Sequence, residues 1–213
     1  MKRAFLFDAS AVTHYYIHNP KFADVLAFLL SIKESEGANF FIPSFCVAET
    51  LNTFAKHHYR WNLLDADLYK KIREDFVDSV HNRKLFYSYD LNRYHNLNAE
   101  EIFPLEHTIN TEFVFVDGEK PSGKTMADRE KDLDRLQQKL KDQGVDFGKH
   151  YLSTFDVLLI AMAKELRRFF GESNTFIVTK DQRLSKICEE IRICKAIYLP
   201  ATTIESLKAR MKL

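Results

Sequence analysis

The sequence begins with a short apolar run that ends in an acid, Ala4-Phe5-Leu6-Phe7-Asp8-Ala9-Ser10. Residues 4–7 carry no polar side chain, which is typical of a strand buried on both faces in the middle of a parallel sheet. Asp8 would then lie at the carboxyl end of that strand, the edge at which open α/β sheets bind their ligands. Because an aspartate after a strand is also a common helix N-cap, Asp8 predicts a functional site only if other acids reach the same edge.

Two further apolar runs are followed by acidic residues in the same way. Phe40-Phe41-Ile42-Pro43 predicts a second buried strand, and Ser44 is expected to cap a helix that carries Glu49 in its early turns. Residues 175–179 predict a third strand, and Asp181 follows it almost at once. Both acids are therefore expected at the edge where Asp8 lies.

Asp156 is expected to open the most apolar helix of the chain, and an acid in the first turn of such a helix points back towards the strand ends. Four carboxylates at one edge repel one another unless cations neutralise them. Oxygen ligands without a histidine or cysteine pattern favour Mg²⁺ or Mn²⁺ over Zn²⁺. Such ions activate an attacking water and stabilise a leaving oxygen, which is the chemistry of phosphodiester hydrolysis. The sequence thus predicts a nuclease site formed by Asp8, Glu49, Asp156 and Asp181.

Four segments, in this order, resemble the motifs of the PIN domain, the fold of the VapC-type toxin ribonucleases: FDAS (7–10), PSFCVAET (43–50), STFDVLLIAMA (153–163) and FIVTKDQRL (176–184). The resemblance covers roughly residues 3–80 and 150–200, and the middle of this chain is longer than in a compact toxin. It implies an α/β, PIN-like (Rossmann-like) fold with a central parallel sheet flanked by helices. It also implies that the acidic quartet of the family corresponds to Asp8, Glu49, Asp156 and Asp181.

The resemblance adds two hydroxyl groups to the expected site. Thr179 stands two residues before the last acid, where the family has Ser or Thr, and Ser10 stands two residues after the first. Such hydroxyls are expected to orient the acids or a water. The implied function is that of an endoribonuclease, dependent on Mg²⁺ or Mn²⁺, which hydrolyses RNA to 5′-phosphate and 3′-hydroxyl ends. The partners that the resemblance implies are RNA, a small antitoxin protein if the chain is a toxin, and a second copy of the chain.

Two alternatives of other classes stay open. One is a catalytically silent, PIN-like binding or scaffold protein, for which loss of an acid would be the signature, although all four are present. The other is nucleotide binding, since GEKPSGKT (118–125) fits the phosphate-loop pattern between an expected strand at 112–116 and an expected helix at 124–143. It is the weaker of the two, because this helix is highly charged and a phosphate loop normally opens a buried one.

We expect one domain spanning residues 1–213, with an insertion or elaborated helical region at about 91–148 that includes a short helix near 98–106. Residues 56–61 (KHHYRW) are basic and aromatic. They are predicted with equal weight to be a surface for RNA or a helix end whose cations match its dipole. Periodicity predicts the remaining elements, which are helices at 22–36, 44–59, 65–80 and 182–191 and strands at 85–89 and 195–199.

The composition limits the class of protein. The net charge of +1 excludes a strongly basic, DNA-coating protein. No apolar run reaches the length of about eighteen residues that suggests a membrane span, and Asp8 interrupts the first apolar run too early for a secretory signal. The three cysteines lack metal-ligand spacing and are expected to be buried free thiols of a cytoplasmic protein.

Overall fold

A computed structural model describes residues 2–114, 125–128 and 152–212 of the protein, together with positions 131, 132, 135, 138 and 142. In this part of the chain, five strands form one parallel sheet in the order β3-β2-β1-β4-β5. The strands are β1 (Ala4–Phe7), β2 (Asn39–Pro43), β3 (Tyr87–Tyr89), β4 (Thr175–Thr179) and β5 (Lys195–Tyr198). The predicted α/β class is confirmed, and the parallel sheet flanked by helices is consistent with a PIN-like, Rossmann-like fold.

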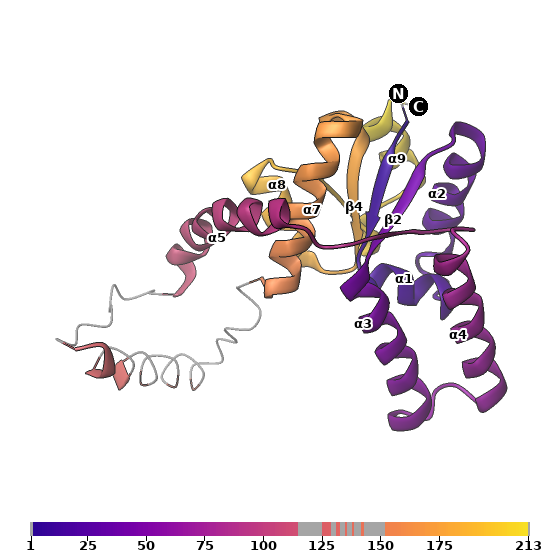
Figure 1. Ribbon diagram of the computed structural model, residues 1–213, viewed down its shortest axis with the longest axis horizontal. Coiled ribbons are helices and arrows are strands. Elements are labelled where there is room, and N and C mark those ends of the chain that lie inside the picture. Colours follow the sequence, from indigo (N-terminus) through magenta and orange to yellow (C-terminus); the bar gives the residue numbers. More distant parts are fainter. Residues whose placement is uncertain are drawn as a thin grey trace.

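Helices cover both faces of the sheet, with α7 and α8 on one side and α2 on the other (Figure 1). Helix α5 packs across α7, and α3 and α4 extend beyond the carboxyl ends of the strands (Figure 1). The α-helices whose bounds are described are α1 (Ala9–Tyr16), α2 (Ala23–Glu36), α3 (Ser44–Ala55), α4 (Ala66–His81), α5 (Arg93–Val114), α7 (Thr154–Phe170), α8 (Gln182–Ile191) and α9 (Ile204–Met211).

The first strand occupies the centre of the sheet because its side chains are apolar on both faces. It pairs with β2 on one side and β4 on the other, so that Phe5 lies opposite both Phe40 and Phe176. The Phe5 ring stacks on Phe176 with 5.4 Å between centroids, while Phe7 packs against Phe40 and Phe86. Each fully buried ring contributes about 1.5–3 kcal/mol to stability. The buried run thus places Asp8, which follows it, at the middle of the carboxyl edge.

Several predicted helix ends are confirmed and one cap is corrected. Gly37 ends α2 with a φ of 64°, the left-handed conformation that glycine adopts easily, and Asp65 caps α4 by accepting from the Leu68 amide at 2.8 Å. The prediction that Ser44 caps α3 is wrong, since Pro43 has the N-cap position and Ser44 is the first helical residue. The last helix, α9, begins with a capping box formed by Thr203 and Ser206.

The predicted helix at 44–59 consists of two parts. Helix α3 ends at Ala55 and is continued by a π-helix, η1 (Lys56–Arg60). Tyr59 is 75% and Trp61 47% exposed there, so the aromatic and basic character predicted for 56–61 lies at the surface. Whether this surface contacts RNA or only ends a helix stays a prediction.

The region at 91–148 differs from the sequence expectation. Helix α5 is continuous from Arg93 to Val114, so the predicted strand is wrong at 112–114, and residues 115 and 116 lie outside the described residues. Adding a residue to an existing helix fixes only that residue for each new hydrogen bond, which favours extension over a new strand. Most of the expected helix at 124–143 and residues 118–124 of GEKPSGKT also lie outside the described residues. The nucleotide-binding hypothesis and the single-domain prediction therefore stay predictions.

Two expectations drawn from composition can be compared with the structure. No helix among the described residues is both long and apolar enough to cross a membrane. All three cysteines are buried and free, as predicted. The thiols of Cys188 and Cys194 lie 3.3 Å apart, and Cys46 lies near the expected site.

Candidate metal-binding site

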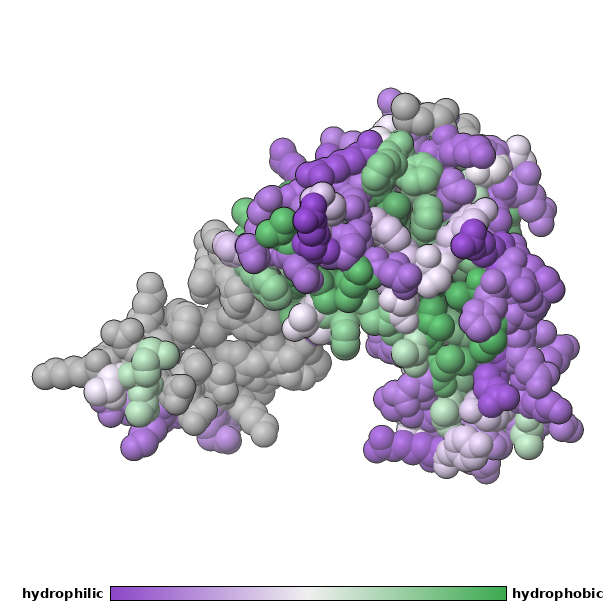
Figure 2. Space-filling view, viewed as in Figure 1, coloured by the Kyte–Doolittle hydropathy of each residue, from purple (hydrophilic) through white to green (hydrophobic). Residues whose placement is uncertain are grey.

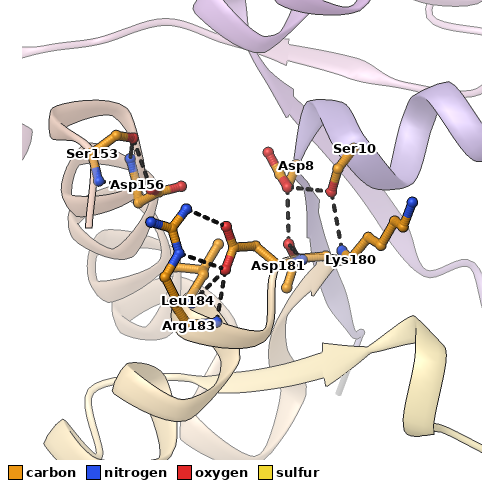
Figure 3. A network of polar contacts seen from close by, with 9 residues as sticks. Asp8, Ser10, Ser153, Asp156, Lys180, Asp181, Arg183 and Leu184 are labelled. Carbon is orange, nitrogen blue, oxygen red and sulfur yellow. Dashed lines mark hydrogen bonds and ion pairs between the residues drawn. The ribbon is translucent and has the colours of Figure 1, made fainter. Parts of the chain in front are cut away.

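A cavity of about 230 Å³ lies at the carboxyl edge of the sheet, between α3 and the start of α7. All four acids of the predicted quartet line it, although they come from distant parts of the sequence. The lining residues are Asp8, Ser10, Phe45, Cys46, Glu49, Ser153, Phe155, Asp156, Leu159, Asp181 and Arg183. Figure 3 shows Asp8, Asp156 and Asp181 approaching one another from three elements. The four acids therefore line one cavity, and among the described residues the ligand atoms close enough together for one metal ion are those of Asp8, Cys46 and Glu49.

Asp8 has the backbone position of a helix N-cap without acting as one. Its side chain makes no capping hydrogen bond to α1. Instead, Oδ2 accepts hydrogen bonds from the Ser10 hydroxyl at 2.5 Å and the Thr179 hydroxyl at 2.9 Å. Asp8 therefore does not cap helix α1, although helix capping was the alternative to a functional role for this aspartate. The carboxylate is instead held in a fixed orientation at the base of the cavity.

The two hydroxyls are themselves oriented by backbone amides (Figure 3). The Lys180 amide donates to Ser10 Oγ at 3.0 Å, and the Asp181 amide donates to Thr179 Oγ1 at 2.9 Å. Because each hydroxyl oxygen already accepts a hydrogen bond from an amide, its own hydrogen is directed to Asp8. Both hydroxyls predicted from the sequence therefore belong to the network, and they connect the ends of β1 and β4.

Glu49 and Cys46 project from one face of α3, three residues apart. The ligand atoms of Asp8, Cys46 and Glu49 all lie within 4.8 Å of one another, close enough to form a metal-binding group. Burial, and then the charge of Asp8, raise the pKa of the Cys46 thiol, so the thiol is neutral at pH 7. The sequence argument missed Cys46 as a neighbour of the acids, although its i−3 spacing from Glu49 was the available signal.

Asp156 combines a structural role with its place in the cavity. It is the third residue of α7, not the first, and forms a capping box with Ser153. Its Oδ2 accepts from the Ser153 amide at 2.9 Å and the Ser153 hydroxyl at 2.7 Å. Burial raises the pKa of Asp156, the Ser153 bonds oppose that rise, and the charge of Asp181 adds to it. The pKa of Asp156 is raised overall, so the hydrogen bonds from Ser153 only partly offset the effects of burial and of the Asp181 charge.

Asp181 differs from the other three acids because it is already compensated. Its Oδ1 caps α8 by accepting from the amides of Arg183 at 2.7 Å and Leu184 at 3.2 Å. Its Oδ2 forms an ion pair with the Arg183 guanidinium at 2.9 Å. Burial acts to raise the pKa of Asp181, but these hydrogen bonds and the Arg183 charge outweigh it, and the pKa is lowered. Arg183 was not foreseen as part of the site.

The charged forms of Asp8 and Glu49 are destabilised by their surroundings, which favours a bound cation. The pKa of Asp8 is raised to about 6, mainly by burial and to a smaller extent by the charges of Asp156 and Glu49, while the hydrogen bonds from Ser10 and Thr179 act to lower it. Burial and the charge of Asp156 also raise the pKa of Glu49, while Lys56 opposes this. A divalent ion that prefers oxygen ligands would relieve this repulsion, so the donor set fits such an ion.

Comparison with protein-family models gives no match to this chain, and comparison with curated proteins gives none either. Function is therefore inferred from the residues of the cavity.

Proposed function

We propose that the protein is a metal-dependent endoribonuclease of the PIN type. The observation that carries the proposal is the state of Asp8. It is a desolvated carboxylate with a raised pKa, held by two hydroxyls away from its expected capping role, and surrounded by Glu49 and Asp156. A fold that only needed an N-cap at this position would not require those hydroxyls. The resemblance of the four motifs to the PIN family supports the same function.

Asp8 and Glu49 would hold Mg²⁺ or Mn²⁺ directly, with Asp156 beside them. When bound, the ion supplies Lewis acidity for hydrolysis and neutralises charge on the scissile phosphate. Ser10 and Thr179 keep Asp8 in the orientation in which it binds, as outer-shell partners do in other metal sites. The Cys46 thiol, being neutral, is expected to exclude water rather than to bind a hard ion.

Arg183 gives Asp181 a conditional role in this proposal. The guanidinium pairs with Asp181 Oδ2, so Asp181 would be a stronger metal ligand once Arg183 turns away from it. A guanidinium released in this way can form two parallel hydrogen bonds with a phosphate. RNA binding would then exchange the Asp181–Arg183 ion pair for contacts from Arg183 to phosphate and from Asp181 to the cation.

The proposal is tested by cleavage of an end-labelled RNA with Mg²⁺ or Mn²⁺ and with EDTA. We expect cleavage only with the divalent ion, with 5′-phosphate products, and a loss of about 100-fold or more in Asp8→Asn. Asp24→Asn, an exposed acid in the first turn of α2, is the matched control and should cleave like the original protein. Cleavage by Asp8→Asn at the original rate would contradict the proposal.

The Asp181–Arg183 ion pair also supports the second candidate, a catalytically silent binding or scaffold protein, because it compensates the charge of one acid without a cation. Binding of RNA without cleavage, in both the original protein and Arg183→Ala, would favour this candidate. Roles as a toxin with a small antitoxin partner, or as a homodimer, follow from the resemblance and would be tested by co-purification and by light scattering.

A further inference from the structure

Two aromatic rings, Phe45 and Phe155, stack against each other at the cavity of the four acids. Phe45 comes from the start of α3 and Phe155 from the first turn of α7. Their centroids are 5.1 Å apart and their planes differ by 22°. Both line the cavity, so this aromatic pair and the carboxylates share one space.

The structure holds the pair in place although Phe155 is not part of the core. Phe155 is 54% exposed, and its backbone lies inside the capping box that Ser153 forms with Asp156. One face of its ring is covered by Phe45, and more than half of the side chain remains open to solvent. Exposing so much apolar area has a free-energy cost that packing of the fold does not require.

The chemistry of the neighbours indicates what this ring binds. The acids, with a cation, would take a phosphate, and the Arg183 side chain, which lines the same cavity, could donate to that phosphate. A neutral, apolar ring offers nothing to a phosphate, but its open face matches the face of a nucleobase. Figure 2 shows hydrophobic surface in the hollow between the α7 side and the α3–α4 side of the molecule.

We propose that the Phe45–Phe155 pair stacks on one unpaired base of the nucleic acid whose phosphate lies over the acids. This deepens the proposed nuclease function, and rests on it, by naming the residues that hold a base beside the phosphate. A base inside a duplex has both faces covered by its neighbours and cannot add a stacking partner without leaving the helix. The aromatic pair therefore selects an unpaired segment without reading its sequence.

The test measures the affinity of a short single-stranded RNA, labelled with 2-aminopurine, in Ca²⁺ so that binding is observed without hydrolysis. Stacking on an aromatic side chain makes about a 5- to 100-fold difference in affinity per base. We expect Phe155→Leu to lose affinity by a factor in that range and Phe155→Trp to retain it. Phe169→Leu is the matched control, since Phe169 is on the same helix, is 71% exposed and does not line the cavity.

A scan with abasic nucleotides assigns the contact to one position and needs no variant of the aromatic pair. Removing one particular base should weaken binding to the original protein by the same factor, while removal of the others has a small effect. In Phe155→Leu, removing the base at that position should no longer weaken binding, because the variant has already lost the stacking contact. The same strand made double-stranded should bind more weakly than the single strand, and the DNA version shows whether the 2′-hydroxyl matters.

The results separate this inference from the proposed function. If no base position is sensitive, if Phe155→Leu binds like the original protein, or if duplex binds as tightly as single strand, the stacking role is wrong even when Mg²⁺ supports cleavage. The opposite result is also possible. If one abasic position weakens binding to the original protein but not to Phe155→Leu, and the protein never cleaves RNA, the stacking role is supported while the nuclease proposal fails. Absence of binding to every strand overturns both.

Discussion

At the scale of single residues, Asp8 shows two opposing influences on one carboxylate. The hydroxyls of Ser10 and Thr179 stabilise its charged form, and burial destabilises it by more. The raised pKa means that the folded protein binds a proton at Asp8 more readily than the unfolded chain does. The site is thus charged at pH 7 at a cost in stability, which is typical of a group arranged for binding and not for folding.

Asp8→Asn is expected to stabilise the metal-free protein. In the original protein, stability falls as the pH rises from the unfolded pKa near 3.8 through the folded pKa of about 6, and the loss is complete at pH 7. Asparagine keeps an oxygen to accept the two hydroxyl bonds but carries no charge. We expect a gain of about 1–3 kcal/mol in urea unfolding at pH 7 in EDTA. No gain at pH 7, or an equal gain at pH 4, would contradict the assigned pKa.

Thr179→Val tests whether the hydroxyl orients Asp8. Valine keeps the shape of threonine but removes the donor to Asp8 and the acceptor for the Asp181 amide. We expect a loss of about 10- to 100-fold in Mn²⁺ affinity or cleavage, as for other outer-shell partners, with recovery in Thr179→Ser. Thr175→Val, at the other end of β4, removes a buried hydroxyl bond to Gly171 and should affect stability without affecting Mn²⁺ affinity.

At the scale of elements, the first turn of α7 positions two functional groups at once. The Ser153–Asp156 capping box fixes the direction in which the helix begins, and Phe155 lies within it. A change in the cap would therefore move both the carboxylate and the ring. The link between a local hydrogen-bond motif and the geometry of the cavity can be tested because α9 has a second capping box.

Ser153→Ala is expected to reduce stability and activity together. Loss of the cap costs about 1 kcal/mol and allows the first turn of α7 to fray, which displaces Asp156. Thr203→Ala removes the corresponding cap of α9 and should cost a similar amount. The measurement is urea unfolding alongside cleavage of RNA. Equal activity in the two variants would show that the α7 cap serves stability alone.

At the scale of the whole molecule, a buried polar network connects α5, α7 and the edge strand β3. Glu165 of α7 accepts hydrogen bonds from Tyr89, Asn92 and His95, and His95 is fully buried. The Asn92 amide donates to His95 Nδ1 at 3.0 Å, so the ring proton is on Nε2 and points to Glu165. This network holds the helix that leads into the middle region against the core.

Glu165→Leu is expected to destabilise the protein by about 3–5 kcal/mol, since it leaves buried partners without an acceptor. Burial acts to raise the pKa of Glu165, but the bonds from Tyr89, Asn92 and His95 lower it overall. Its stabilising effect is therefore present above the unfolded pKa near 4.5 and is lost as the pH falls through the lower folded value. Urea unfolding from pH 7 to pH 3 should show this acid limb in the original protein and not in the variant.

The buried strands could be predicted from the sequence because a strand covered on both faces is an almost unbroken run of apolar residues. Residues 4–7 and 175–179 are strands, as their apolar runs predicted, and Asp8 and Asp181 follow them. Acids after parallel strands must share an edge once the strands pair, so their convergence could be predicted. The strand expected at 112–116 is wrong at 112–114, where extending an existing helix is more favourable than starting a short new strand.

The sequence by itself determined the buried strands, the helix caps near Asp65 and Gly37, and the set of acids at the carboxyl edge. Only the tertiary structure decided that Cys46 lies beside Asp8 and that Phe45 stacks on Phe155. The physical reason is the range of the interactions. Periodicity and capping act within a few residues, whereas contact between Phe45 and Phe155 depends on how two helices pack after the sheet has formed.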